Sequence, residues 1–513
     1  MGFALVGCSS IRKDFVRQPT SALSPISDTP SSRYIGAVLN QHRGQSGFRL
    51  LTRSSNALMS RIAIIDQARH SIDLQYYIFK NDATGRLVAQ HLLAAADRGV
   101  RVRMLLDAMD LTNEDRMLGA LDAQPSIEVR LFNPFGTRAP SMLSKVGQFI
   151  VEGRRLNRRM HNKSLIVDGT VAIIGGRNIG DDYFDASNDT NFRDVDLIAI
   201  GPVVQQASHS FDSYWNCDAA YPVRAFRDAR DTQADLTMLR IALAKEARSF
   251  AQSDYAEAAS EAFPEGATSD RRGEWFWGAA ELVSDSPDKI DMEVDVPSLR
   301  IGPKLKAMIA GAQSEVLLIS PYFVPGDSGS QFLIGIAGRG IQVKVLTNSL
   351  ASNDEPAAYS GYARYRVKLL EKGVILYELR PDQGAAQRIT ARGRSSGISL
   401  HAKAMVVDGQ HVFIGSLNMD QRSKLLNTEM GLIVDSAPLA QAVEQFFDTA
   451  TLPENAFHVV LQQVPEGPGY PWQMRWLYSD KGALINASSE PGATEGRRIE
   501  VFVLRMLPLE NML

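Results

Sequence analysis

The sequence predicts an α/β protein built from two related halves, each a mixed, largely parallel β-sheet flanked by helices. Its 513 residues exceed what a single hydrophobic core normally supports, so at least two core units are expected. The stretch 160–178, MHNKSLIVDGTVAIIGGRN, returns without a gap at 400–418 as LHAKAMVVDGQHVFIGSLN. Helix-like and strand-like periodicities alternate around both copies, which is typical of a sheet covered by helices. We therefore expect a pseudo-twofold pair of halves that share one active site at their interface.

The repeat extends beyond the two motifs, element by element. In each half an amphipathic helix pattern precedes a strand rich in β-formers, at 58–79 and again at 305–324. A helix end, a glycine and another strand follow at 95–107 and 335–348. A strand that ends at a proline then occurs at 127–134 and at 374–381. A last strand follows each motif, at 194–200 and at 429–435.

These correspondences give the expected domain boundaries. We place the first half at 46–220 and the second at 278–450. Residues 221–277 have helical spacing and are expected to form a helical connector. Residues 1–45, rich in Ser and Pro toward their end, are expected to be a tether, and 451–513 a C-terminal extension.

Three adjacent aromatics, Trp275, Phe276 and Trp277, allow two interpretations. They could form a membrane-inserting finger. They could also open the first strand of the second half, because the segment 280–290 that follows them occupies the place that 48–58 occupies in the first half. We favour the core strand.

Bulk composition excludes several classes of protein. The formal net charge is −3, whereas wholesale nucleic-acid binding usually needs a strongly basic chain, so no nucleic-acid partner is expected. No apolar run reaches the roughly 18 residues of a membrane-spanning helix. Two cysteines cannot make a disulfide framework, and no Asp/His cluster with metal-ligand spacing accompanies either motif, so no metal or cofactor is expected.

Each motif places a histidine and a lysine on one face of a strand. His161 and Lys163 are two residues apart, and Asp168-Gly169 then supplies a turn that returns the chain as a hairpin. The second motif repeats this pattern with His401, Lys403 and Asp408. One such pair would ordinarily be a solvated surface. Two copies at identical spacing, in two halves that pack together, predict one site with two imidazoles and two ammonium groups.

That set of groups suits a phosphodiester. One imidazole can attack phosphorus, and the other can protonate the leaving oxygen and then deprotonate the acceptor. Lys163 and Lys403 can stabilise the negative charge of the transition state, and the amides of Asn178 and Asn418 can donate to phosphate oxygens.

The imidazoles also need orienting partners. Aligned strands offer Asp194 and Glu429, with Asp196 as an alternative to Asp194. We group Asp168 and Asp408 with the catalytic motif but assign them mainly to holding the hairpin turns.

The paired HxK…D…G[SG]xN elements resemble the phospholipase D superfamily. The segments 366–381, 211–223, 345–366 and 490–513 are similar to the bacterial cardiolipin synthase C branch. The resemblance implies phosphatidyl transfer from phosphatidylethanolamine to phosphatidylglycerol, which yields cardiolipin. It also implies that His161 is the nucleophile and His401 the general acid/base, in a monomer of two fused halves. A phospholipase D-type hydrolase that releases phosphatidic acid is the alternative, and a nuclease is the weaker one.

The two motifs differ at one position that matters for the site. Gly176 stands where the second copy has Ser416, and where the family often has serine. We expect Ser416 to contribute a hydroxyl that the first-motif side lacks. We also expect Gly176→Ser to leave the fold intact and to change the rate only modestly.

A lipid substrate implies contact with a bacterial membrane, peripheral or through a lipid anchor. Cys8 follows Leu5-Val6-Gly7, which resembles a lipoprotein processing site, although the seven residues before it lack the basic start of a signal; lipidation and an idle thiol both remain open. The C-terminal 497–513 is densely apolar but is interrupted by Pro508; it could lie at the membrane interface or pack on the core, and we favour membrane contact. A basic cluster before the first motif could bind anionic headgroups or be a solvated loop: Lys145, Arg154, Arg155, Arg158 and Arg159.

Overall fold

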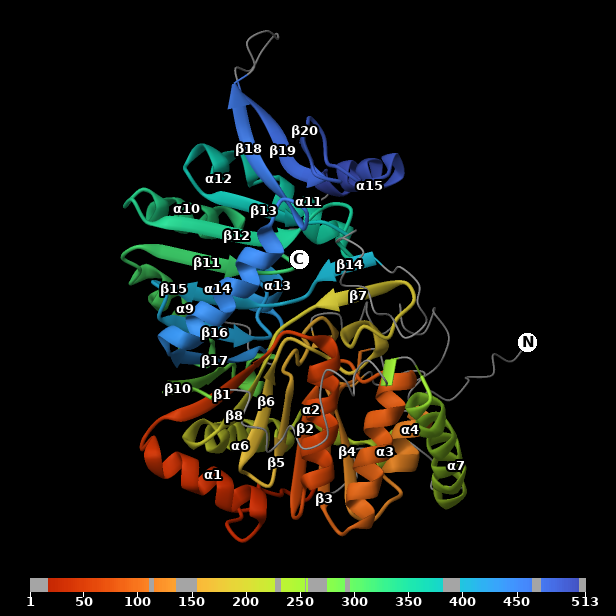
Figure 1. Ribbon diagram of the computed structural model, residues 1–513. Coiled ribbons are helices and arrows are strands. Elements are labelled where there is room, and N and C mark those ends of the chain that lie inside the picture. Colours follow the sequence, from red (N-terminus) through yellow and green to blue (C-terminus); the bar gives the residue numbers. More distant parts are fainter. Residues whose placement is uncertain are drawn as a thin grey trace, which may run out of the picture.

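The structure is a computed structural model that describes residues 17–109, 115–134, 155–226, 232–253, 255–256, 275–290, 296–381, 397–463 and 472–506. Its main feature is a continuous 18-stranded sheet that runs through both halves, with helices on its faces (Figure 1). The predicted α/β fold of two repeated halves is confirmed.

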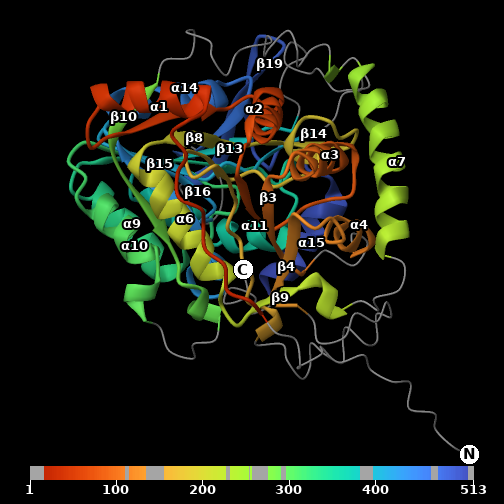
Figure 2. The ribbon, with the colours of Figure 1, turned by 90° about the horizontal axis from the view of Figure 1, so that it is seen from below.

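The first half contains the following elements: α1 (Pro30–Gln41), β1 (Ser46–Leu51), α2 (Ser54–Gln67), β2 (Ser71–Tyr76), α3 (Ala83–Asp97), β3 (Arg101–Asp107), α4 (Asp115–Leu121), β4 (Ile127–Phe132), β5 (Ser164–Val167), β6 (Val171–Gly175), β7 (Thr190–Arg193), β8 (Asp196–Ile200), α6 (Pro202–Trp215) and β9 (Ala220–Pro222). The helix α7 (Thr232–Ala251) follows and packs against α3 and α4 at the edge of this half (Figure 2).

The second half repeats the order: β10 (Phe276–Ser284), α9 (Gly302–Ala310), β11 (Glu315–Ile319), α10 (Gly326–Ala337), β12 (Gln342–Asn348), α11 (Pro356–Ala363), α12 (Arg366–Glu371), β13 (Ile375–Leu379), β14 (Gly397–Leu400), β15 (Ala404–Val407), β16 (His411–Gly415), α13 (Gln421–Leu425), β17 (Met430–Asp435) and α14 (Ala437–Thr451). The chain continues through β18 (Ala456–Gln463), β19 (Trp472–Asp480), β20 (Ala483–Ala487) and α15 (Glu495–Arg505).

Strand pairing makes the twofold relation visible. The strands run in the order β9-β4-β3-β2-β5-β6-β8-β1, and then β10-β17-β16-β15-β11-β12-β13-β18-β19-β20. From the β1–β10 junction outward, the two halves list equivalent strands in the same order. Among the described strands of this 18-stranded sheet, only β2-β3-β4 and β11-β12-β13 pair in parallel. Antiparallel pairs therefore outnumber parallel pairs, although the sequence predicts a largely parallel sheet. The strands of each motif pair antiparallel, and so do the strands at the junction of the halves and at the outer ends of the sheet.

The predicted opening strand of the second half is confirmed as β10, and it joins the two half-sheets. Its first residues pair with β1, with Trp277 opposite Gly47, and its later residues pair with β17. Trp277 also stacks on His42 with ring centroids 3.9 Å apart. Phe276 is likewise part of the sheet, and Trp275, immediately before β10, packs against Arg49 of β1 rather than projecting as a finger.

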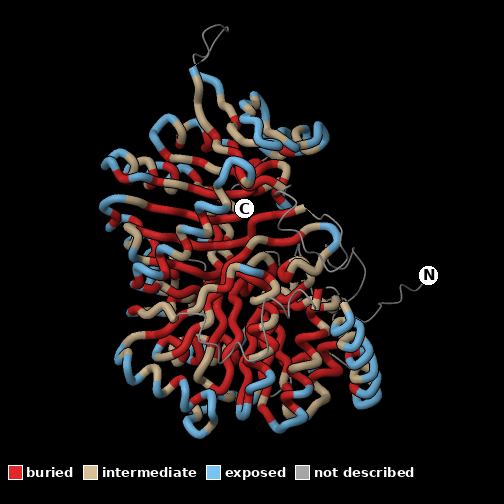
Figure 3. The backbone as a smooth tube through the Cα atoms, in the orientation of Figure 1, coloured by how far each residue is buried: buried red, intermediate tan, exposed pale blue. Residues whose placement is uncertain are grey.

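Three hydrophobic clusters hold the fold together. One lies under α2 and α3, and another under α9, α10 and α11. The third is shared by both halves, because Phe211 and Trp215 of α6 and Val443 and Phe447 of α14 pack into the same cluster. Figure 3 shows this centre as buried strands, with exposure concentrated on outer helices. A shared core of this kind makes the relation between the two motifs rigid.

Candidate active site

The two histidine motifs meet where the halves join, through strands that cross between them. β7 of the first half pairs in parallel with β14 of the second, and a single bridge joins Met160 to Thr428. The His161 amide donates to the Thr428 carbonyl at 2.8 Å, and the His401 amide donates to the Arg193 carbonyl at 2.7 Å. Each histidine backbone is thus held by the opposite half.

The residue before each histidine is anchored from its own half, at the end of the third strand. The Met160 amide donates to Asp107 Oδ2 at 2.9 Å, and the Leu400 amide donates to Asn348 Oδ1 at 2.8 Å. Both anchors are buried. The sequence offered a signal for them, because Asp107 and Asn348 end the aligned segments 95–107 and 335–348.

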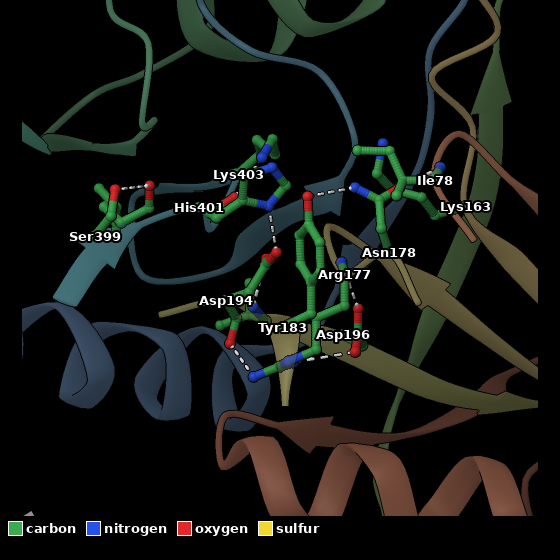
Figure 4. Close-up of polar contacts among 12 residues, drawn as sticks. Ile78, Lys163, Arg177, Asn178, Tyr183, Asp194, Asp196, Ser399, His401 and Lys403 are labelled. Atoms are coloured by element: carbon green, nitrogen blue, oxygen red, sulfur yellow. Dashed lines mark hydrogen bonds and ion pairs between the residues drawn. The ribbon is translucent and has the colours of Figure 1, made fainter. Parts of the chain in front are cut away.

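The acidic partners of the imidazoles are exchanged between the halves. His161 Nδ1 lies 2.9 Å from Glu429 Oε2, and His401 Nδ1 lies 2.6 Å from Asp194 Oδ2 (Figure 4 shows the second pair). A carboxylate can only accept here, so each Nδ1 carries the hydrogen and each Nε2 keeps its lone pair. The alternative partner Asp196 is wrong, because that carboxylate binds the buried Arg61 and Arg177 at 3.0 Å each.

Burial keeps both imidazoles neutral. It lowers the pKa of His161 to about 4, against the opposing charge of Glu429. It lowers the pKa of His401 well below 6.5, and the charges of Lys403 and Lys163 lower it further. The lysine of each motif thus also acts on the pKa of the imidazole in the other motif.

The two lysines lie in the same buried region. Lys163 Nζ donates to the His161 carbonyl at 2.7 Å, and Lys403 Nζ donates to the His401 carbonyl. Burial lowers the pKa of Lys163 well below 10.5 and that of Lys403 to about 8. A bound anion would favour the charged form of both amines and would be stabilised by them in return.

The two motif asparagines have different partners. Asn178 donates from Nδ2 to the Tyr183 hydroxyl at 2.8 Å and accepts from the Ile78 amide at 3.2 Å (Figure 4). Asn418 Oδ1 is buried and lacks a hydrogen-bond partner in the part of the chain that the structure describes. The equivalent amides are therefore not equally available to a ligand.

Ser416 and Gly176 occupy equivalent places beside the two acids. Ser416 Oγ donates to Glu429 Oε2 at 2.5 Å and accepts from the Met430 amide at 3.0 Å. A Cβ built on Gly176 would lie 2.2 Å from Asp194 Oδ1 and 2.9 Å from its Cγ. Because that carboxylate is bound to His401, the close contact argues for a larger loss of rate than the modest change expected for Gly176→Ser. The glycine allows the acid to approach.

Asp168 and Asp408 hold the hairpin turns, at the opposite end of each hairpin from the histidine. Both have positive φ, 53° and 54°. Asp168 accepts from the amides of 69, 70 and 71 at 2.7–2.9 Å. Asp408 accepts from the amides of 313, 314 and 315 at 2.8–3.1 Å; although burial opposes the shift, these donors lower its pKa to about 2. Neither carboxylate contacts an imidazole.

The basic cluster before the first motif is mostly engaged inside the protein. Arg159 is fully buried and donates to Asp107 and to the Asn133 carbonyl, so its predicted role as a headgroup contact is wrong. Arg155 and Arg158 are half-buried and donate to the carbonyls of Pro134 and Ile290. The other expected membrane contacts lie outside the described residues: Cys8, Lys145 and Arg154.

Sequence reasoning missed the aromatic walls around the imidazoles. Tyr77 lies edge-on to His161 at 5.1 Å between ring centroids. Tyr183 and Phe192 flank His401 at 5.2 and 5.0 Å. Tyr77 and Phe192 lie in or next to strand segments that the repeat had aligned, but their inward direction depends on the packing of the two halves.

The described residues lack both a metal-binding cluster and a membrane-spanning helix. They contain no group of three or more His, Cys, Asp or Glu side chains arranged to hold a metal ion. None of their helices combines the length and apolarity needed to span a bilayer.

Comparison with known proteins agrees with this geometry. A family model described as "Cardiolipin synthase, PLD-like domain" matches residues 62–215 and 305–451, one match per half. Cardiolipin synthase C of Escherichia coli K12 is 40% identical over 489 residues, which cover 94% of this chain and 100% of that protein. An uncharacterized protein of Helicobacter pylori J99 is 33% identical and covers 91% of this chain and 90% of its own.

A solved structure shares the whole architecture. The crystal structure of phosphatidylserine synthase from Haemophilus influenzae covers 94% of this chain and 100% of its own, with a TM-score of 0.56 and 12% identity. At that identity the likeness supports the fold alone. Together with the family match in both halves, it confirms the predicted two-half phospholipase D-like fold. The chain therefore belongs to the phospholipase D-like cardiolipin synthase family, as the repeated motif predicted.

Proposed function

We propose that this enzyme forms cardiolipin by moving a phosphatidyl group from one phospholipid to another through a phosphohistidine. The donor is a phospholipid such as phosphatidylethanolamine, and the acceptor is phosphatidylglycerol. The observation that supports it most strongly is the exchanged pair of acids, which leaves both Nε2 atoms unprotonated and ties each imidazole to the half opposite its own. The 40% identity to a cardiolipin synthase C over almost the whole chain supports the substrate class.

In the first half-reaction His161 Nε2 attacks the phosphorus of the donor lipid. A P–N bond forms while the bond from phosphorus to the headgroup oxygen breaks. His401 acts as the general acid, which requires that its Nε2 takes up a proton when the anionic phosphodiester binds. Glu429 stabilises the charge that develops on His161, and Asp194 does so for His401.

In the second half-reaction the acceptor hydroxyl replaces the headgroup. His401, now neutral, removes the hydroxyl proton as the oxygen attacks phosphorus, and the P–N bond to His161 breaks. Lys163 and Lys403 stabilise the charge on the phosphate oxygens, with donation from Asn178 and Asn418 once a ligand is present. No cofactor takes part in this scheme.

The same residues could transfer the phosphatidyl group to water, so the acceptor decides between transferase and hydrolase. The test is to incubate the full chain with vesicles that contain labelled phosphatidylethanolamine and phosphatidylglycerol, and to separate the products. We expect labelled cardiolipin, which is lost in His161→Asn. His411→Asn is a matched control, since His411 is a half-exposed histidine of β16 bound to Asp435.

Phosphatidic acid without cardiolipin would replace the proposal with a hydrolase. Cleavage of DNA that depends on His161 would point to the nuclease alternative. The proposed site of action is the bacterial membrane, reached as a peripheral or lipid-anchored protein, with one chain supplying both halves of the site.

A further inference from the structure

The helix α15 exposes an apolar stripe that the proposed chemistry does not use. Ile499, Phe502, Val503 and Met506 are 63%, 59%, 51% and 67% exposed. They are spaced i, i+3, i+4 and i+7, so they form one continuous face of the helix. Val501 points the other way and is 5% exposed, within the core of the second half. Figure 3 shows α15 as an exposed element beside a buried sheet.

Basic groups lie at the edge of this stripe. Arg505 is exposed at the end of α15, and the exposed Arg364 donates to its backbone carbonyl. Arg498 is half-buried on the same flank, paired with Glu495. An amphipathic helix with apolar side chains on one face and arginines at its border is the usual form of a segment that lies in a membrane interface.

The helix is also connected to the active site. Arg497 of α15 donates to the Asn353 carbonyl, in the loop that follows β12. In that loop Asp354 accepts from the Tyr322 hydroxyl at 2.8 Å, and its charge raises the pKa of Lys403 against the larger effect of burial. Figure 1 shows α15 on the same side of the sheet as β7 and β14. Helix α15 is therefore fixed to the loop after β12, and we call this loop and α15 the rim of the site.

We propose that the Ile499–Met506 face of α15 docks the enzyme on a lipid surface with anionic headgroups. This inference rests on the proposed function, because a water-insoluble substrate gives the rim of the site a reason to meet a bilayer. Moving side chains of this size from water into the interface lowers the free energy of the bound state, and the arginines add attraction to anionic lipids. Docking at this rim would bring donor and acceptor lipids to the histidines without a spanning helix.

The test compares two double variants of the full chain. Ile499→Ser/Phe502→Ser removes the centre of the stripe. Met238→Ser/Ile241→Ser is the matched control, since these residues of α7 are 61% and 62% exposed. Co-sedimentation is measured with vesicles of phosphatidylethanolamine and phosphatidylglycerol, and with phosphatidylcholine alone. Circular dichroism confirms that each variant is folded.

We expect the α15 variant to bind the mixed vesicles at least about tenfold more weakly than the wild type, and the control to bind normally. Arg505→Glu should reduce binding to the mixed vesicles but not to phosphatidylcholine. Turnover of monomeric short-chain phospholipids should be unchanged in the α15 variant, because these residues do not touch the histidines.

Unchanged vesicle binding by the α15 variant would overturn the docking proposal, as would an equal loss in the control. Conversion of a dimer to a monomer by the same substitutions would show that a second copy covers the stripe instead. Binding that depends on α15 without phosphatidyl transfer would contradict the proposed function alone. Transfer without α15-dependent binding would contradict docking alone.

Discussion

The two acid–histidine pairs share a scaffold but are built differently. On one side Glu429 holds His161, and Ser416 donates a further hydrogen bond to that acid. On the other side the shorter Asp194 holds His401, and a glycine leaves room for it. Ser416 therefore stands beside the longer acid, Glu429, and Gly176 beside the shorter one. The size of each small residue matches the room that its neighbouring acid leaves.

The electrostatic consequence of this difference is also visible. The pKa of Glu429 is lowered, because His161, Lys163 and Ser416 together outweigh burial. The pKa of Asp194 is raised, because burial outweighs its cationic neighbours. A firmly ionised acid behind His161 suits a group that must carry positive charge as phosphohistidine. The more basic acid behind His401 suits a group that gives and takes protons.

The largest effect on turnover is expected when each imidazole is removed separately. His161→Asn and His401→Asn should each reduce turnover of the natural lipids by at least about 10⁴-fold. With a p-nitrophenyl phosphodiester, whose leaving group needs no proton, His401→Asn should recover much of the covalent step and His161→Asn should not. Trapped phosphate should map to His161. Recovery in His161→Asn instead would exchange the two roles.

Neutralising the acids should have the next largest effect. Asp194→Asn and Glu429→Gln keep the size of each side chain but can favour the wrong imidazole tautomer. We expect losses of about 10³-fold in kcat, with KM little changed. Glu429→Gln should slow formation of the phosphohistidine more than Asp194→Asn does, as measured by rapid quench with labelled lipid. Equal effects on both half-reactions would remove the functional distinction between the acids.

Exchanging the small residues should have a smaller effect that differs between the halves. Gly176→Ser should reduce kcat about 100-fold, because the new Cβ displaces the Asp194 carboxylate from His401. Ser416→Gly should reduce it only about tenfold, since it removes one hydrogen bond and creates no clash. Thermal unfolding separates loss of activity from loss of structure. A harmless Gly176→Ser would show that the first-motif side can accommodate a serine after all.

The buried neutral histidine should make stability depend on pH. The unfolded chain protonates His161 near 6.5, whereas the folded chain does so near 4, so only the unfolded state binds this proton between those values. The free energy of unfolding should fall as pH falls through this window, by about 3 kcal/mol for this group. Urea titrations at pH 7 and pH 4 should show a smaller fall in His161→Asn than in His411→Asn. An identical pH dependence in both variants would contradict the neutral imidazole.

The smallest effect on activity is expected at the turns. Asp168→Asn should lower the free energy of unfolding by about 2 kcal/mol, because its carboxylate accepts three backbone amides. We expect kcat to change less than about threefold, since the turn is distant from the imidazoles. A large loss of kcat with normal stability would show that Asp168 has a role in catalysis.

The sequence by itself determined the repeat, the two hairpins and the chemical groups of the site. Local patterns carry that information: the i, i+2 spacing of His161 and Lys163, the Asp-Gly turns and the aligned strands. The same local patterns misjudged Arg159, whose charge suggested a surface although Asp107 neutralises it inside the protein.

Only the tertiary structure decided which acid serves which histidine. The sequence places Asp194 near the first motif and Glu429 near the second, but the halves cross and exchange them. It also decided that Gly176 is there for close approach, and that α15 turns an apolar face outward. The exchange of the acids depends on contacts between segments more than 200 residues apart, and no local periodicity records such contacts.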